Sequence, residues 1–322
     1  ITDRTAFHFS YGQFYQFPDL VNMYNYSNYM GEGISPPGWS EAANSLAKDF
    51  LYGNPYYPFP YNITDWYIPE VGTPNVKPQR SVQYETGLRT RIGSQYLLTA
   101  NLYYKDMFDY IASKRYDADP SQYAIYENMD YANSRGLEFT LKKLFSNGID
   151  WDLNYTLSRA EGNAPTPDYH WYVAEWASGY DWRDFNRTYT MPWDQTHTLN
   201  FRLNYFTQNG FGLSTISSYG SGLPYTPEDA RARPIDEQYS GRMPSTSNTN
   251  LKLFYDKKMR GYDVRFFADI TNLFNKENVL AVDNTTGEPD ATLDSGQSPM
   301  IIWKPYYISA PRHIELGISI SR

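Results

Sequence analysis

The stretch SVQYETGLRTRIGSQYLLTANLYYKD, residues 81–106, decides the fold. In its first half, Val82 and Leu88 occupy one set of alternate positions, and Glu85 and Arg89 occupy the other. A short glycine-containing link follows, and the same alternation then returns. Because successive side chains of a strand point to opposite sides, this stretch predicts a β-hairpin with one apolar face and one charged face.

The same alternation recurs along the whole chain and predicts about ten strands by the strand template. They are expected near residues 5–13, 80–92, 95–112, 134–145, 149–160, 194–206, 211–220, 249–256, 261–274 and 312–321. No linker rich in serine and glycine divides the 322 residues, so we treat residues 1–322 as one β-domain.

The connections between these strands alternate strictly between short and long. The short ones contain glycine and fall at Gly93–Ser94, Ser146–Gly148, Thr207–Gly210 and Lys257–Gly261. The long ones run from Phe14 to Pro78, Ser113 to Asn133, Glu161 to Thr190, Gly222 to Thr249 and Asn275 to Pro311. Ordinary loops have about 4 to 6 residues. Tight turns on one side and long loops on the other are typical of an antiparallel transmembrane β-barrel of the outer membrane.

The composition is consistent with this fold class and excludes several others. Aromatic residues make up 18% of the chain, as expected where rings line two membrane interfaces. There is no cysteine, which excludes disulfides and thiolate metal sites, and the net charge of −8 argues against binding of nucleic acid. A barrel carries its apolar residues at alternate positions, so the absence of a long apolar run does not argue against a membrane location.

Several motifs resemble those of TonB-dependent outer-membrane receptors, particularly the Oar-like branch. They occur in the order typical of the family across nearly the whole chain. The motifs are Tyr11–Phe14 with Gln16 and Pro18, Lys77–Tyr84 with Glu85 and Gly87, Leu102–Asp106, Pro192–Leu199, Ser221–Pro227 and Asp269–Asn275.

The resemblance implies a barrel of about 22 strands that surrounds an N-terminal plug. This chain would supply only the C-terminal strands, with the plug and the earlier strands absent. It implies TonB-dependent transport of a scarce ligand, of the siderophore, glycan or peptide class, across the bacterial outer membrane. The expected partners are the lipid bilayer with its lipopolysaccharide, the TonB energy-coupling complex acting through the plug, and a surface lipoprotein or other outer-membrane subunits.

The expected site residues fall into two groups. Aromatic rings in the long loops offer rigid contact area for a ligand, although they can also simply pack the loops. These candidate ligand contacts are Tyr56, Tyr57, Trp66, Tyr67, Trp171, Tyr172, Trp176, Tyr180 and Trp182. The charged residues expected to face the lumen are Glu85, Arg89, Arg91, Lys105, Glu138, Arg202, Arg265 and Asp269.

No catalytic or cofactor site is expected. The four histidines, His8, His170, His197 and His313, lack the spacing of paired metal ligands, and the strand charges are expected to pair across a wet lumen wall. The acidic positions Asp283, Asp290 and Asp294 favour a solvated loop over a calcium site, because they lack the EF-hand spacing.

Two other classes of protein remain open. One is a barrel that serves as a structural or assembly subunit of an outer-membrane complex. The other is a soluble all-β carbohydrate-binding protein, in which the apolar face would form the core of a sandwich. Alternation alone does not distinguish an apolar face that contacts lipid from one that lies in a dry core.

Overall fold

The structure, a computed structural model, describes residues 4–24, 70–116, 123–166, 187–229, 234–294, 299–303 and 305–322. Strands dominate this part of the chain, accompanied by a five-residue helix, α1 (Leu20–Tyr24), and a 3-10 turn, η3 (Pro305–Tyr307). The long strands are β1 (Thr5–Gln16), β3 (Gln79–Ile92), β4 (Tyr96–Tyr116), β5 (Tyr123–Ser146), β6 (Ile149–Gly162), β8 (His197–Phe206), β9 (Phe211–Gly220), β12 (Thr246–Met259), β13 (Tyr262–Thr271) and β16 (His313–Ser321). The short strands are β2 (Glu70–Val71), β7 (Tyr189–Thr190), β10 (Pro224–Tyr225), β11 (Gly241–Arg242), β14 (Asp290–Asp294) and β15 (Pro299–Trp303). None of the described helices is long and apolar enough to cross a membrane.

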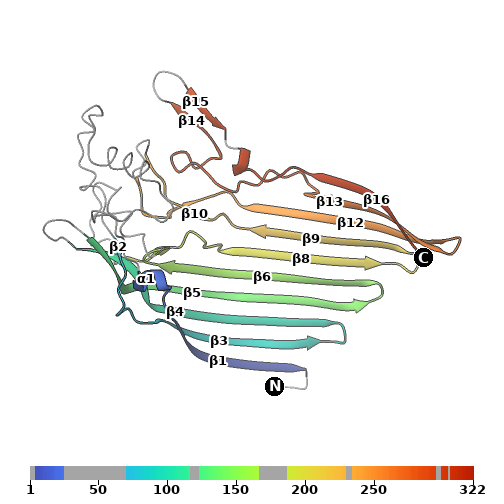
Figure 1. The fold of residues 1–322 in the computed structure, drawn as a ribbon. Helices are drawn as coiled ribbons and strands as arrows, with labels where there is room; N and C mark the ends of the chain where they lie inside the picture. The colour runs from blue at the N-terminus through green and yellow to red at the C-terminus, as the bar shows by residue number, and fades with distance from the viewer. Residues whose placement is uncertain are drawn as a thin grey trace, which may run out of the picture.

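The long strands form a single curved sheet in which each strand pairs with its neighbours along the chain (Figure 1). This 12-stranded sheet has the order β1-β3-β4-β5-β6-β8-β9-β12-β13-β16, with β2 and β7 attached to β5 and β6. All pairings along this path are antiparallel. Among the described residues, β1 pairs only with β3 and β16 only with β13, so the sheet is open. β1 begins and β16 ends on the short-turn side (Figure 1).

The main strand bounds differ from the expected ones on the long-loop side. β4 continues to Tyr116 and β5 begins at Tyr123, so these two strands take up most of the loop expected from Ser113 to Asn133. A β-bulge between Met107 and Tyr110 lies just before residue 112, where this strand was expected to end. The extra residues of β4 lie beyond this bulge, which shifts the alternation, and so they do not continue the period-2 pattern used to place the strands.

One face of the sheet is apolar, and its side chains remain exposed. The register aligns leucines across neighbouring strands, as in the row formed by Leu102, Leu137 and Leu157. Leu102 is 54% exposed and Leu316 is 76% exposed. In the part of the chain that the structure describes, no apolar layer covers this face. A soluble sandwich requires such a layer, so this finding argues against the carbohydrate-binding alternative.

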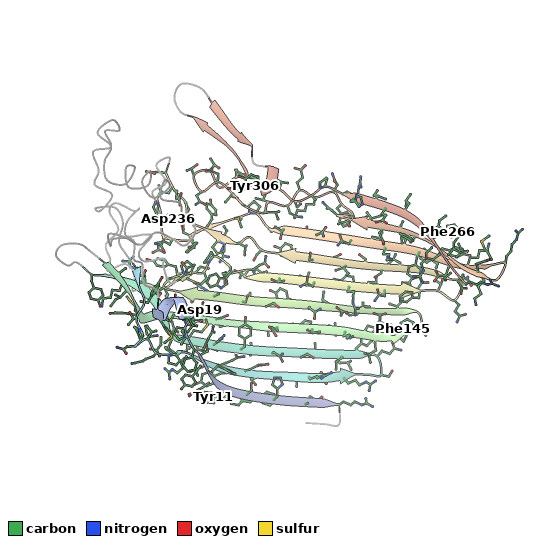
Figure 2. The ribbon with its side chains drawn as sticks, in the orientation of Figure 1. Tyr11, Asp19, Phe145, Asp236, Phe266 and Tyr306 are labelled. Atoms are coloured by element: carbon green, nitrogen blue, oxygen red, sulfur yellow. The ribbon has the colours of Figure 1, made fainter. Side chains whose placement is uncertain are left out.

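The few buried apolar side chains lie at the long-loop end. Ile111, Tyr126 and Val76 form a small cluster there, and Met23 of α1 packs against it. Figure 2 shows Asp19 and Asp236 toward this end, and Phe145 and Phe266 toward the short turns. The buried packing therefore stabilises the bases of the long loops, whereas the strands are held mainly by their ladder of backbone hydrogen bonds.

The short turns use residues in the left-handed backbone region. Asn147 (φ 53°) with Gly148 (φ 79°) and Arg260 (φ 52°) with Gly261 (φ 84°) form the two tightest links. Two-residue turns with positive φ match the twist of antiparallel strands. The last short turn was expected from Lys257 to Gly261, but β12 continues to Met259 and reduces it to the two residues before β13.

Gly210 and Gly261 allow a matched test of what these turns require. Both have φ above +80°, but a Cβ at Gly210 would lie 2.2 Å from the carbonyl oxygen of Asp256, whereas a Cβ at Gly261 meets nothing within 4 Å. Gly261→Ala is expected to lower the free energy of unfolding by about 1 kcal/mol, from backbone strain alone. Gly210→Ala is expected to cost about 2 kcal/mol, because the backbone must also shift. Urea titration of the protein folded into lipid vesicles measures both, and equal losses would contradict the role of the close approach.

Candidate functional site

The apolar face ends on the long-loop side at a group of charged residues. On β6 the alternate apolar residues of this face, here called the apolar band, run from Ile149 to Leu157. Arg159 and Glu161 follow at the next two positions of the same face. Glu161 accepts Arg135 at 3.2 Å and Arg159 at 2.6 Å. A stretch of about nine residues matches a tilted strand that crosses the hydrocarbon core. This cluster therefore marks the outer border of the apolar band, and β4 and β5 continue beyond it.

The opposite face carries ion pairs between adjacent strands. All of the paired side chains are partly exposed, as expected for a wet surface. The pairs are Arg202 with Asp152 (Nε to Oδ1, 2.7 Å), Lys252 with Asp269 (Nζ to Oδ2, 2.9 Å) and Arg265 with Asp256 (Nε to Oδ1, 2.7 Å). Register opposes the two members of each pair directly, so each is a cross-strand contact of opposite charges. Of the charges expected to line a lumen, Arg202, Arg265 and Asp269 lie in these pairs.

The remaining expected charges lie on β3, β4 and β5. Glu85, Lys105 and Glu138 line a cavity of about 240 Å³ together with Gln83, Asn101 and Tyr103. The Nε2 atom of His8 lies 3.4 Å from a carboxylate oxygen of Glu85. Arg91 donates to the backbone oxygen of Ser94 in the short turn at 3.1 Å, and Arg89 lies opposite Thr99 of β4. These charges share one face of the sheet, but they do not converge on a single site.

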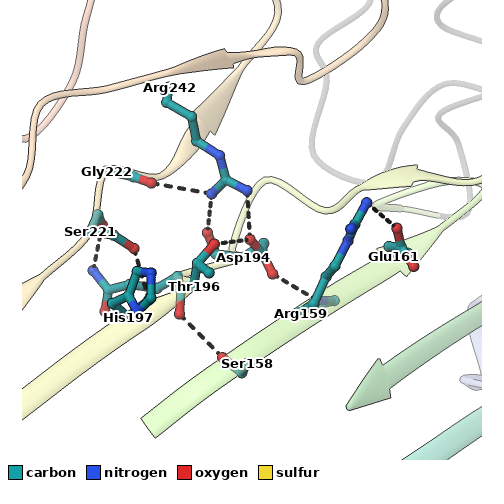
Figure 3. Close-up of polar contacts among 11 residues, drawn as sticks. Ser158, Arg159, Glu161, Asp194, Thr196, His197, Ser221, Gly222 and Arg242 are labelled. Atoms are coloured by element: carbon teal, nitrogen blue, oxygen red, sulfur yellow. Dashed lines mark hydrogen bonds and ion pairs between the residues drawn. The ribbon is translucent and has the colours of Figure 1, made fainter. Parts of the chain in front are cut away.

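The most strongly organised polar group lies where the chain enters β8 (Figure 3). The side chain of Asp194 is only 1% exposed, and its carboxylate accepts the backbone N–H of Ala160 at 2.7 Å and the hydroxyl of Thr196 at 3.1 Å. Arg242 of β11 donates to Oδ2 of Asp194 at 2.8 Å, and also to the backbone oxygens of Asp194 and Gly222. One buried carboxylate thus joins β6, β8 and the strand pair β10-β11.

Neighbouring hydrogen bonds extend this junction (Figure 3). The Ser221 hydroxyl accepts the backbone N–H of His197 at 3.0 Å, and Ser158 donates its backbone N–H to the carbonyl of Thr196 at 3.0 Å. The buried Met191 lies in the same turn and donates its backbone N–H to Ala160. The loop-side ends of β6, β8 and β9 are therefore held in one fixed arrangement.

A second junction is built from asparagines after β13. Asn272 has φ 55° and donates its side-chain amide to the backbone oxygens of Lys276 and Ala310. Asn278 binds both the N–H (2.8 Å) and the carbonyl (2.9 Å) of Ser247 on β12. Amide side chains that bind backbone groups take the place of the interstrand backbone hydrogen bonds where the strands end. These contacts hold the segments near residues 278 and 310 against the ends of β12 and β13.

The extension of β4 and β5 has its own polar supports. Asn128 binds the backbone of Lys77 through both its side-chain oxygen and its nitrogen, at 2.7 and 2.9 Å. The hydroxyl of Tyr131 donates to Asp106, and burial together with this hydrogen bond raises the pKa of Tyr131 above its ordinary value. Tyr131 lies beyond the apolar band and stays protonated throughout the physiological range. The base of this hairpin is thus rigidly attached to the sheet.

The other expected site residues have different outcomes. All of the candidate loop aromatics, Tyr56, Tyr57, Trp66, Tyr67, Trp171, Tyr172, Trp176, Tyr180 and Trp182, lie outside the described residues, as does His170. Asp283 lies in a turn where its side chain accepts Thr285, and its backbone oxygen accepts Gly287. Within the described segments, no group of three potential metal ligands comes together. His197 binds the hydroxyl of Tyr155 at 2.9 Å.

Sequence reasoning missed the residues that hold the loop bases, namely Arg242, Asn272 and Asn278. The motif around Asp269–Asn275 placed Asn272 at a strand end, but nothing in the sequence indicates which distant backbone it binds. Arg242 lies 48 positions from Asp194 in a segment without periodicity. A lone arginine in such a segment carries no pattern that predicts a partner.

Comparisons with known proteins agree with this architecture. The family model described as TonB dependent receptor-like, beta-barrel matches residues 1–273. The ferric enterobactin receptor PfeA from Pseudomonas aeruginosa has a similar structure, with a TM-score of 0.56, 15% identity and coverage of 99% of this chain and 38% of that one. The outer membrane transporter YddB from Escherichia coli is similar with a TM-score of 0.53, 12% identity and coverage of 79% and 34%.

These two likenesses show a shared fold, because both identities are low. A search of curated proteins gives no match. The chain spans about a third of the length of the two solved structures, 34% in one case and 38% in the other. The open antiparallel sheet, its exposed apolar face and the family match over residues 1–273 agree, and the chain therefore belongs to the family of TonB-dependent receptor β-barrels of the outer membrane.

Proposed function

We propose that this chain forms part of the wall and rim of a barrel that takes up a scarce ligand across the outer membrane. The family consists of receptors and transporters, and PfeA is named as a ferric enterobactin receptor. The proposed ligand class is a siderophore, a glycan or a peptide. The long loops would capture this ligand, and the barrel lumen would let it pass.

The observation that carries this proposal is the paired, partly exposed charge on one face of a sheet whose other face is apolar. A barrel wall needs this arrangement, with lipid on one side and water on the other. In this proposal Glu85, Arg89, Arg91, Lys105 and Glu138 also face the lumen. The junction at Asp194 and the asparagines after β13 would fix the loop bases at the rim, as pre-organised binding requires.

The proposed partners follow from the same reasoning. The apolar band contacts the bilayer, and the charged border of Arg135, Arg159 and Glu161 lies at the level of the lipopolysaccharide headgroups. Energy would come from the TonB complex through a plug that these residues do not include. A surface lipoprotein or another outer-membrane subunit would bind the long loops, where we also place the ligand contacts of the nine candidate aromatics.

Uptake experiments test this function directly. Deletion of the gene is expected to abolish growth on one scarce nutrient from a panel of ferric siderophores, oligosaccharides and peptides, and loss of TonB is expected to produce the same defect. Radiolabelled uptake in cells with and without TonB measures this dependence. A stable stoichiometric partner in purified material, with no uptake defect on deletion, would instead favour the structural or assembly barrel.

A further inference from the structure

A cavity of about 330 Å³ lies where β9, β12 and β13 end on the long-loop side. The polar-face residues Ser218, Thr246, Asn248 and Thr271 contribute to its lining, and the rest comes from Ser247 of β12, Asn272 and loop residues near 280 and 310. By register and alternation, these four strand residues belong to the polar face. The volume is at the small end of the range of ligand sites, which is about 300–1,000 Å³.

The frame of this cavity is pre-formed. Asn272 and Asn278 line it, but their amide groups are used on backbone atoms of Lys276, Ala310 and Ser247. Each of these contacts links a loop segment to a strand end. The cavity therefore keeps its shape without a ligand, and a ligand would not have to order it.

Four polar atoms of the lining are left without a protein partner. In the part of the chain that the structure describes, the hydroxyls of Ser218, Thr246 and Thr271 make no hydrogen bond. The side-chain oxygen of Asn248 is buried and also unpartnered, while its nitrogen donates to Asn250 at 3.2 Å. A buried acceptor without a partner is costly, so such a group indicates a site that a water molecule or a ligand completes.

Among the residues that the structure describes, the lining of the cavity is uncharged. The amine of Lys276 lies beside it and donates to the Ser247 hydroxyl at 3.0 Å. A cationic ligand would lose hydration here without gaining an opposite charge, and the amine of Lys276 is already engaged by the Ser247 hydroxyl. Hydroxyl and amide groups beside the apolar surface of Leu280, Ala310 and Pro311 match a molecule with many hydroxyl groups and C–H faces, and that description fits a sugar ring.

We propose that this cavity is a binding site for a neutral sugar unit. The hydroxyls of Ser218, Thr246 and Thr271 and the oxygen of Asn248 would exchange hydrogen bonds with the sugar hydroxyls, and Leu280 and Pro311 would contact its apolar face. This inference rests on the proposed function and makes it more specific, since it selects the glycan class of ligand. Binding can nevertheless be measured without transport.

The test uses the whole protein purified in detergent and saturation-transfer NMR. The probes are maltotriose, cellotriose and laminaritriose, with trigalacturonate as the charged comparison. At least one neutral trisaccharide is expected to bind at millimolar concentration. The double variant Thr246→Val/Thr271→Val, which removes two hydroxyls at constant shape, is expected to bind it about tenfold more weakly.

Two controls make the result specific. Thr99→Val makes the same chemical change on the same polar face of the sheet, but on β4 and away from the cavity. It is expected to leave binding unchanged. Ser218→Ala removes a third lining hydroxyl and is also expected to weaken trisaccharide binding, which tests the site if the double variant folds poorly. The inference is wrong if no neutral trisaccharide binds, if the cavity variants bind like the wild type, or if trigalacturonate binds better than every neutral probe. If the protein fails these binding tests but cells still take up a ferric chelate in a TonB-dependent manner, the sugar site is wrong and the proposed transport function is retained.

Discussion

Arginine in place of Leu153 is expected to lower the free energy of unfolding by about 2–4 kcal/mol, the cost of a cationic side chain at the bilayer midplane. Leu153 lies at the centre of the apolar band of β6, between Leu141 of β5 and Phe201 of β8. Positions on either side along the strand keep this face apolar from Ile149 to Leu157. The arginine cannot reach either interface from this position without distorting the bilayer. Urea titration of the protein folded into lipid vesicles measures the loss.

Thr156 provides the matched control on the same strand. It lies on the opposite face, where register places it against Glu138 of β5 and Thr198 of β8. Thr156→Arg is expected to change the free energy of unfolding by less than about 1 kcal/mol, because an exposed cation near a carboxylate gains or loses little. If the two substitutions have equal costs, or if Thr156→Arg has the larger cost, the polar face does not border water and the lumen assignment fails.

The sheet could be predicted from the sequence because its signal is local. Alternate residues of one strand lie on one face, so Leu153 and Asp152 assign their own faces without any knowledge of the neighbouring strands. The short turns predicted which strands are neighbours. Two strands joined by a tight glycine-containing link such as Asn147–Gly148 can only pair with each other, and in an antiparallel manner. Local pattern and short connections together specify an antiparallel meander.

The loop bases could not be predicted, because their contacts join distant parts of the chain without periodicity. Asp194 and Arg242 illustrate this, since each lies in an irregular segment and the pair forms only when β9 brings the two segments together. The strand was expected to end at residue 112, and the continuation of β4 to Tyr116 was missed because a bulge between Met107 and Tyr110 shifts its alternation. The polar cavity near Asn248 likewise depends on where the segments near residues 278 and 310 fold back.

Replacement of Arg242 by methionine is expected to destabilise the rim locally by about 2–3 kcal/mol, because it leaves the buried carboxylate of Asp194 without its cation. The Ala160 N–H and the Thr196 hydroxyl would remain as hydrogen-bond donors. The guanidinium side chain is 40% exposed, and so we place the cost below that of a fully buried pair. Amide hydrogen exchange near residues 191–197 and 241–243 reports the free energy of this local opening.

Arg159→Met is the matched control, since it removes an arginine from an ion pair in which Glu161 keeps Arg135 as a second partner. Its expected cost is less than about 1 kcal/mol. Adding Asp194→Asn to the Arg242→Met variant should recover part of the loss, because the neutral amide can still accept the Ala160 N–H and leaves no buried charge. A double-mutant cycle that yields no coupling energy between positions 194 and 242 would contradict the junction. A positive coupling would mean that the two rim segments open together, so that a ligand bound by one of them also stabilises the other.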